Sequence, residues 1–168
     1  MAARGAPGSL VSDTWFAQVR ADGKWIHAFG DNQRLIVRGT LGAEKTGNFD
    51  DLPPELRFFA GGDRSIRGYV YQEIGVVNSK GLVIGGEDLI VASTEYEYYF
   101  KPNWGIATFV DTGDAYTGFN TFKLRIGTGL GLRWRSPVGM VRADIGVPVN
   151  DPYGKTGVEL HLVIGPDL

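Results

Sequence analysis

Apolar and polar residues alternate with a period of two along most of this chain, a pattern typical of β-strands whose two faces meet different surroundings. Almost no segment has the longer period of an amphipathic helix. The chain is therefore expected to be all-β. The pattern predicts seven strands, over residues 15–29, 34–43, 90–100, 106–115, 122–134, 140–149 and 157–165.

The alternation is clearest over residues 122–134, where one face is apolar and the other combines cations with glycines. A face of this kind is too polar for the core of a soluble protein. The strand over residues 90–100 repeats the division, with Glu95 and Glu97 on the face opposite Tyr96 and Tyr98. The polar face of residues 122–134 consists of Lys123, Arg125, Gly127, Gly129, Gly131 and Arg133.

Several predicted strands run ten or more residues, whereas strands of soluble sheets have about five or six. Strands of about ten residues suit a tilted crossing of a lipid bilayer. Short turns at one end and long loops at the other are typical of a transmembrane antiparallel β-barrel, with the short turns periplasmic. The short turns are predicted at residues 29–33, 101–104 and 136–139, and the longer links at residues 44–87, 114–120 and 150–156.

Aromatic side chains lie near the ends of the predicted strands, where the headgroup layers of a membrane would hold them. They are Trp15, Trp25, Phe29, Phe100, Trp104, Phe122 and Trp134. A soluble β-sandwich is the alternative architecture, since its sheets also alternate. Three glycines on one face of a single strand argue against the sandwich, because glycine weakens a strand unless another backbone comes close.

The composition is that of a folded chain, with 168 residues, 43% hydrophobic, 25 glycines and 8 prolines. The 17 basic and 19 acidic residues form no basic stripe, so nucleic-acid binding is not expected. The chain has no cysteine, and its 2 histidines, His27 and His161, are too few for a zinc cluster. Neither a metal site nor a cofactor is expected.

The first ten residues lack the apolar segment of a secretory signal. No apolar run approaches the roughly 20 residues of a membrane-spanning helix, so a membrane role would use strands. We therefore expect the chain to be an excised piece of a longer exported protein. Residues 1–12 are expected to be a disordered or extraneous N-terminal segment, and residues 13–168 a single β-domain.

Two short motifs resemble those of enzymes. The tripeptide Asp111-Thr112-Gly113 matches that of aspartic proteases, but one copy lacks the second carboxylate that such a site needs. A dimer would supply it, yet a small protease built of short strands does not explain the long alternating strands. The sequence GTGLG at residues 127–131 lies inside a predicted strand and before no helix, which excludes a dinucleotide-binding turn. The chain is not expected to be an enzyme.

The long link over residues 44–87 contains the sequence RFFAGGDRSIRGY, at residues 57–69. This sequence places Arg67 between Ile66 and Gly68, within a loop that carries several glycines. A guanidinium held inside a protein needs a carboxylate partner, because an unpaired buried charge is costly. The loop therefore raises the question of which acidic residues meet Arg67.

Several blocks of sequence, in order, resemble one family of outer-membrane proteins. The blocks are FFAGGDRSIRGY, STEYEY, ATFVDTGDAY, GTGLGLRWRSPVGMVRADIGVPV and a final IGPDL. They are similar to the C-terminal barrel of the TamA family, the translocation and assembly module of Gram-negative outer membranes. That family belongs to the superfamily of barrel assembly factors and two-partner secretion transporters. The resemblance implies a barrel of about 16 strands after periplasmic POTRA domains, of which this chain would supply the seven or so C-terminal strands.

The resemblance also implies that the long extracellular loop folds back into the barrel lumen. In the family the motif arginine pairs with acids on the following strands, which here are Glu95 and Asp111. Together with Arg67, Gly68 and Tyr69 they form the predicted loop lock. Glu97 is an alternative partner, and the alternative to a lock is a solvated Arg67. Gly127, Gly129 and Gly131 would either leave a groove for the returning loop or make their strand flexible.

The function implied by the resemblance is promotion of the insertion or translocation of autotransporter-like proteins at the outer membrane. The implied partners are outer-membrane lipid, substrate outer-membrane proteins and, for the full-length protein, a TamB-like periplasmic protein. The last strand, residues 157–168, would form the weak seam to which a substrate strand adds. A two-partner secretion pore is the alternative function. A seven-stranded sheet would leave two open edges in lipid, so closure on itself and self-association both stay open.

Overall fold

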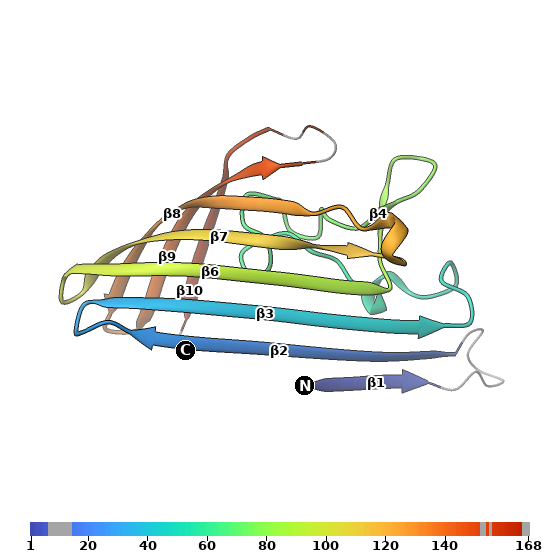
Figure 1. The fold of residues 1–168 in the computed structure, drawn as a ribbon, viewed down its shortest axis with the longest axis horizontal. Coiled ribbons are helices and arrows are strands. Elements are labelled where there is room, and N and C mark those ends of the chain that lie inside the picture. The colour runs from blue at the N-terminus through green and yellow to red at the C-terminus, as the bar shows by residue number, and fades with distance from the viewer. Residues whose placement is uncertain (7–14, 152–153, 155, 166–168) are drawn as a thin grey trace.

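The computed structural model of the chain describes residues 1–6, 15–151, 154 and 156–165 (Figure 1). Eight strands form one antiparallel sheet in the order β1-β2-β3-β6-β7-β8-β9-β10. The strands of this sheet are β1 (Ala2–Ala6), β2 (Phe16–Ala28), β3 (Gln33–Thr46), β6 (Asp88–Lys101), β7 (Trp104–Tyr116), β8 (Arg125–Ser136), β9 (Gly139–Asn150) and β10 (Glu159–Gly165).

All seven predicted strands are present, as β2, β3 and β6 to β10, and each pairs with its neighbour in the chain or across the long loop. The predicted start of one strand at residue 122 is wrong, because β8 begins at Arg125. A short 3-10 helix over Phe119–Thr121 precedes it, and Phe122 packs edge-on against Tyr116 with ring centroids 5.2 Å apart. The aromatic contact therefore places Phe122 in the connection instead of the strand.

Part of the N-terminal segment also differs from expectation. Residues 1–12 are expected to be disordered or extraneous, and within them Ala2–Ala6 form β1, which pairs antiparallel with β2 from Ala2 opposite Arg20 to Ala6 opposite Phe16. Edge pairing uses backbone groups alone, and the small residues of β1 carry no alternating pattern that would reveal a strand. Residues 7–12 lie outside the described residues, as do residues 166–168 of the predicted seam strand.

The two faces of the sheet are chemically reversed compared with those of a soluble protein. Along β6, each outward residue from Ile90 to Phe100 is exposed, and each inward residue from Leu89 to Tyr99 is buried. The inward residues include Ser93, Glu95 and Glu97, while large apolar side chains occupy the outward positions of the neighbouring strands. An apolar outer wall around a polar interior is the pattern of an outer-membrane barrel. The soluble β-sandwich is therefore wrong.

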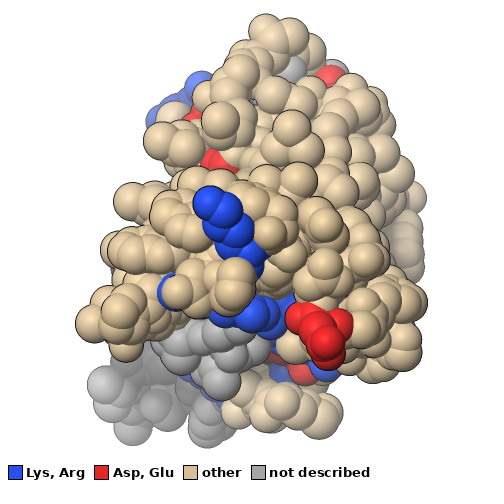
Figure 2. All heavy atoms as spheres, turned by 90° about the vertical axis from the view of Figure 1, so that its left-hand side faces the viewer, with Lys and Arg blue, Asp and Glu red and all other residues tan. Residues whose placement is uncertain are grey.

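The sheet curves so that β9 and β10 lie behind the front strands, with the long loop between the two layers (Figure 1). The turns after β2 and after β6 lie at the left-hand end, and the surface seen from that end is mostly uncharged (Figure 2). Within the described ranges, β1 and β10 each pair with one strand and not with one another, so the sheet is open. None of the described helices is long and apolar enough to cross a membrane.

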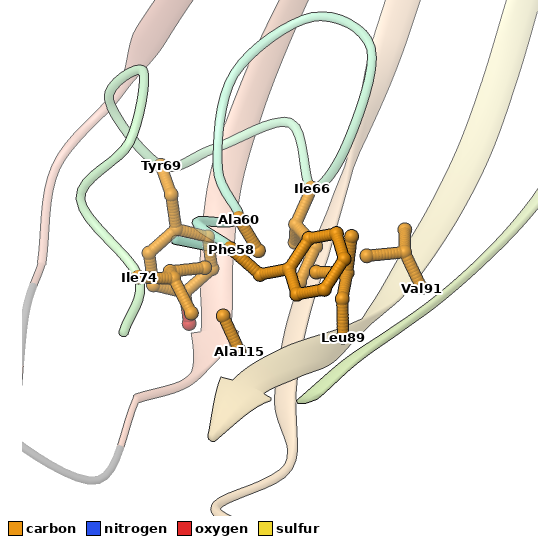
Figure 3. Close-up of a cluster of buried hydrophobic side chains, with 8 residues drawn as sticks. All are labelled: Phe58, Ala60, Ile66, Tyr69, Ile74, Leu89, Val91 and Ala115. Atoms are coloured by element: carbon orange, nitrogen blue, oxygen red, sulfur yellow. The ribbon is translucent and has the colours of Figure 1, made fainter. Parts of the chain in front are cut away.

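The loop between β3 and β6 folds back onto the inner face of the sheet. It contains a 3-10 turn at Pro54–Leu56 and a small hairpin of β4 (Val76–Val77) and β5 (Val83–Gly85), neither of which the sequence predicted. Its apolar side chains pack on the inner face near the starts of β6 and the end of β7 (Figure 3). This cluster, the hydrophobic core between loop and sheet, consists of Phe58, Ala60, Ile66, Tyr69, Ile74, Leu89, Val91 and Ala115.

Candidate functional site

Arg67 lies at the centre of a buried ion cluster on the inner face of the sheet. Its side chain is fully enclosed, with 1% of the residue exposed. Nε and Nη2 donate to the two carboxylate oxygens of Asp111 at 2.7 and 2.9 Å, and the backbone N–H of Arg67 donates to the same carboxylate at 3.0 Å. Nη1 donates to Glu95 at 2.6 Å and to Asp144 at 3.1 Å. The structure thus joins the loop to three strands through one guanidinium.

The strand pairing explains why these carboxylates converge. Asp111 of β7 lies opposite Ser93 of β6, and Glu95 lies opposite Phe109. Residues two apart on a strand share a face, so both acids point inward and their side chains are neighbours. The ring of Phe109 completes the site, because the Arg67 guanidinium carbon lies 3.5 Å from its centroid. That distance places the cation over the ring, where the π-electrons attract it.

A second guanidinium, from Arg133 of β8, binds the same acids from the strand side. It donates to Glu95 at 2.6 Å, to Glu97 at 3.0 Å and to Asp144 at 2.5 Å. Glu97 also accepts from Arg34 and from the Tyr99 hydroxyl. Of the two candidate glutamates, Glu95 contacts Arg67 in the structure, whereas Glu97 is bound by Arg133 and Arg34.

The cluster as a whole is electrically balanced. Four arginines meet four carboxylates, and isolated charges at such depth would be strongly destabilising. Burial alone would lower the pKa of Arg67, but Asp111, Glu95 and Asp144 together hold that pKa above its ordinary value. Arg67 therefore stays charged. The members are Arg34, Arg38, Arg67, Arg133, Glu95, Glu97, Asp111 and Asp144.

The two residues after Arg67 fix the direction of the chain. Gly68 has a φ of 94°, a value that favours glycine, and an added Cβ would lie 2.7 Å from the Val147 carbonyl carbon. The Tyr69 ring is buried, and its hydroxyl donates to the Asn150 carbonyl at 3.1 Å. Burial, with the nearby Asp151 adding to it, raises the pKa of Tyr69 to about 12. Both residues therefore fasten the loop to β9.

The three glycines of β8 do not form one groove for the loop. A Cβ added to Gly127 would overlap the carbonyl oxygen of Arg67, so this glycine does admit the loop backbone. A Cβ added to Gly129 would instead overlap the Ile145 carbonyl oxygen of β9 and lie 2.6 Å from the Phe109 ring, and one added to Gly131 would overlap the Asp144 carboxylate and lie 2.5 Å from the Arg133 guanidinium. Close packing thus accounts for all three glycines, and Gly127 alone of them meets the loop.

The sequence analysis missed five residues of this site. Arg133 was placed on the polar face but given no partner, and neither the cluster arginines of β3, Arg34 and Arg38, nor Asp144 and Gly146 of β9 were identified. Gly146 of β9 faces Gly129 and leaves room for the loop, because an added Cβ would lie 2.6 Å from the Gly68 nitrogen. Asp144 lies two residues before it on the same face. Inward- and outward-facing residues alternate along β9, and this alternation could have placed Asp144 and Gly146 on the inner face.

The cluster leaves part of the interior open. A cavity of about 500 Å³ lies beside it, bordered by β2, β3, β9 and β10 and including Arg38 and Arg142 in its lining. Within the described residues no group of His, Cys, Asp or Glu is arranged to hold a metal ion. Asp111, the aspartate of the protease-like tripeptide, is bound to Arg67 on both oxygens. These features describe an anchored interior loop beside an open space.

Fold and site together define an outer-membrane β-barrel segment with an inward-folded, arginine-anchored loop. The Omp85 superfamily domain matches residues 3–167. The outer membrane protein assembly factor BamA of Nitratidesulfovibrio vulgaris is 32% identical over 151 residues, which are 86% of this chain and 19% of that protein. The crystal structure of BamA from Haemophilus ducreyi lacking POTRA domains 1-3 resembles the fold, with a TM-score of 0.71 and 21% identity, over 94% of this chain and 36% of that one.

The chain belongs to the Omp85 superfamily. The predicted membership of the superfamily of barrel assembly factors is thus confirmed, and so are the transmembrane barrel fold and the Gram-negative outer membrane as its location. Proteins of this family are assembly or transport proteins and not enzymes. The chain spans about a fifth of the curated relative and about a third of the solved chain.

Proposed function

We propose that this chain is the loop-bearing part of an outer-membrane protein assembly factor, one that promotes insertion of other β-barrel proteins. The observation that carries the proposal is the arginine-anchored loop inside an open sheet. The family to which the chain belongs consists of assembly and transport proteins. The curated relative is an assembly factor by name. An edge strand in lipid offers unpaired backbone groups to which a substrate strand can add.

In this proposal Arg67, Gly68 and Tyr69 with Glu95 and Asp111 are the loop lock. The lock holds the loop within the interior, where it limits the free space beside β8 and β9. Its support is the number of bonds that end on one guanidinium and the burial of that side chain. Charge-assisted, bidentate bonds of this kind are specific for arginine, since lysine has no planar fork.

The narrower interpretation is a factor of the TamA branch, with autotransporter-like substrates and a TamB-like periplasmic partner. The resemblance of the sequence blocks around residues 57–69 and 127–149 supports it, while the curated relative is a BamA protein. Outer-membrane lipid and unfolded barrel proteins are partners under either interpretation. Self-association of the chain is a further proposal, motivated by the single pairing of β1 and of β10 within the described sheet.

A transport pore of the two-partner secretion type is the second candidate. The cavity of about 500 Å³ beside the lock favours it, because a polypeptide needs an open path through the interior. Conductance across planar bilayers separates the two functions. An assembly factor should show little steady current, whereas a pore should show a large steady current that a secreted partner blocks.

The proposed function is tested with the chain in liposomes. An unfolded reporter β-barrel protein is added, and its folding is followed by protease protection and by the shift of its folded band in electrophoresis. We expect faster reporter folding than in liposomes that lack the chain, with Arg67→Ala slower than the native chain. Equal folding rates with and without the native chain would contradict the proposal, and a large steady conductance would favour the pore.

A further inference from the structure

The C-terminal strand of the sheet touches the loop motif through His161. β10 is an edge strand, and within the described residues it pairs only with β9. In that pairing His161 lies directly opposite Asp144, the acid that accepts bonds from Arg67 and Arg133. The backbone N–H of Gly68 donates to Nε2 of His161 at 3.3 Å. The residue next to the central arginine is therefore held by the edge strand itself.

The close approach of loop and strand depends on small residues around this bond. Gly68 adopts a φ of 94°, and an added Cβ at Gly146 would lie 2.6 Å from the Gly68 nitrogen. A ring nitrogen accepts a hydrogen bond only in neutral imidazole, in which the other nitrogen carries the proton. The bond thus requires neutral His161 with its proton on Nδ1. A protonated ring would turn an N–H toward the N–H of Gly68.

We infer that His161 is a positioning residue that couples the edge strand β10 to the loop lock. Moving β10 away from β9 removes the acceptor of Gly68, and moving the loop out removes the donor of His161. Two movements that break the same bond favour one another, and the coupling is reciprocal. The importance of this coupling for inserting a substrate strand depends on the proposed function, but the bond between loop and strand does not.

Chymotrypsin cleavage of the full chain in detergent measures the link without any assembly assay. Tyr69 is 1% exposed and is cut only when the loop leaves the interior, whereas Tyr71, 72% exposed, gives an internal reference. Cleavage under single-hit conditions tracks the population of the released loop. Losing one hydrogen bond in His161→Phe should raise the ratio of Tyr69 to Tyr71 cleavage about fivefold. His161→Gln, which keeps an acceptor, should return the ratio toward the native value.

Rescue by the variant that keeps an acceptor decides between coupling and mere packing. His161→Gln should give a cleavage ratio clearly below that of His161→Phe, because its side-chain oxygen can accept from the Gly68 N–H. His27→Phe is the matched control and should leave the ratio at the native value, since His27 is exposed, stacks on Trp25 and meets Phe29 edge-on. A native ratio in His161→Phe, or equal ratios in His161→Phe and His161→Gln, would overturn the coupling. A native chain that fails to assemble a reporter counts against the proposed function and leaves these ratios unaffected.

Discussion

The long loop is enclosed around its arginine motif and exposed at Tyr71 and at the tip of the β4–β5 hairpin, although Ile74 between them is buried in the core. Ile66 and Tyr69, in the part that carries the arginine motif, are exposed by 0% and 1%. Tyr71 and Leu82, in the part that leads into and forms the β4–β5 hairpin, are exposed by 72% and 61%. The two parts are connected directly and both contain apolar residues. Their different positions therefore do not follow from hydrophobicity.

The two parts differ in the contacts that they make with the inner face of the sheet. The motif brings one arginine to three carboxylates and one apolar cluster to β6 and β7. The tip of the hairpin is held by its own residues, with the Asn78 side chain accepting from the backbone of Lys80 and Leu82, and its base is joined to the motif segment, where Arg57 donates to the Ile84 carbonyl at 3.1 Å. We therefore expect the interior acid cluster to select which segment of the long loop enters the barrel. Substitutions in the motif should therefore matter far more than those in the hairpin.

The largest expected effect comes from Arg67→Ala. It removes every described side-chain partner of Asp111 and leaves that carboxylate buried, which costs about 3–5 kcal/mol. Chymotrypsin cleavage after Tyr69, relative to that after Tyr71, should rise by more than about a hundredfold. Arg64→Ala is the matched control, because the Arg64 side chain is 92% exposed. Equal cleavage ratios for the two variants would show that the motif is not anchored by its charge.

A smaller loss is expected from Asp111→Asn, which keeps the shape of the side chain but removes its charge. Hydrogen bonds to charged groups contribute about 1.5–3 kcal/mol, so the same cleavage ratio should rise about tenfold to a hundredfold. Combined with Arg67→Ala, it should add little further, because both changes remove one interaction. Asp22→Asn, in the exposed pair with Arg20, should change the ratio less than about fivefold. Full additivity of the double variant would contradict the direct Arg67–Asp111 interaction.

The fold could be predicted from the sequence because lipid imposes a strict rule on each strand. The inward positions of β6 are polar from Ser93 onward and apolar only where Leu89 and Val91 pack against the loop, and every outward position suits lipid or its interface. The period of two therefore revealed all seven long strands. It did not reveal β1, whose pairing depends on backbone groups of small residues. Nor did it reveal the β4–β5 hairpin, which is too short to show a period.

Only two features of the sequence could predict residues of the site: the loop motif, and the alternation of inward- and outward-facing residues along a strand. The family resemblance implies Arg67, Glu95 and Asp111, and the structure brings the three together. Arg133 and Asp144 were missed because their meeting depends on the register of β8 against β9, where Gly131 lies opposite Asp144. Register between distant residues is set by tertiary packing and turn geometry. A pattern along one strand therefore cannot supply it.

Gly127→Ala tests whether the shape of the inner face of the sheet, as well as its charge, determines that the motif binds there. Its Cβ would overlap the carbonyl oxygen of Arg67, so the loop must shift, at a cost of about 1–3 kcal/mol. We expect about a tenfold rise in the cleavage ratio. Gly39→Ala on β3 is the matched control, because the nearest atom to its Cβ is 3.9 Å away. A larger effect of Gly39→Ala than of Gly127→Ala would point to strand stiffness instead of loop contact.

The smallest expected effect is that of Tyr69→Phe, which removes one hydrogen bond from the buried part of the loop. The lost bond to the Asn150 carbonyl contributes about 1 kcal/mol, so the cleavage ratio should rise about fivefold. Tyr71→Phe, in the exposed part, should leave loop release unchanged, since chymotrypsin also cleaves after phenylalanine and the reference site is kept.

Alkaline titration of Tyr69 tests whether the motif part of the loop is enclosed. Burial raises the pKa of Tyr69 to about 12, so the enclosed loop binds the phenol proton more tightly than a released loop. The stabilisation from this proton is fully present below about pH 10, the ordinary value, and is lost as the pH rises through about 12. Ultraviolet titration of phenolate in the native chain minus Tyr69→Phe should show one group titrating near 12. A difference curve centred at the ordinary value would place Tyr69 in solvent and remove the distinction between the two parts of the loop.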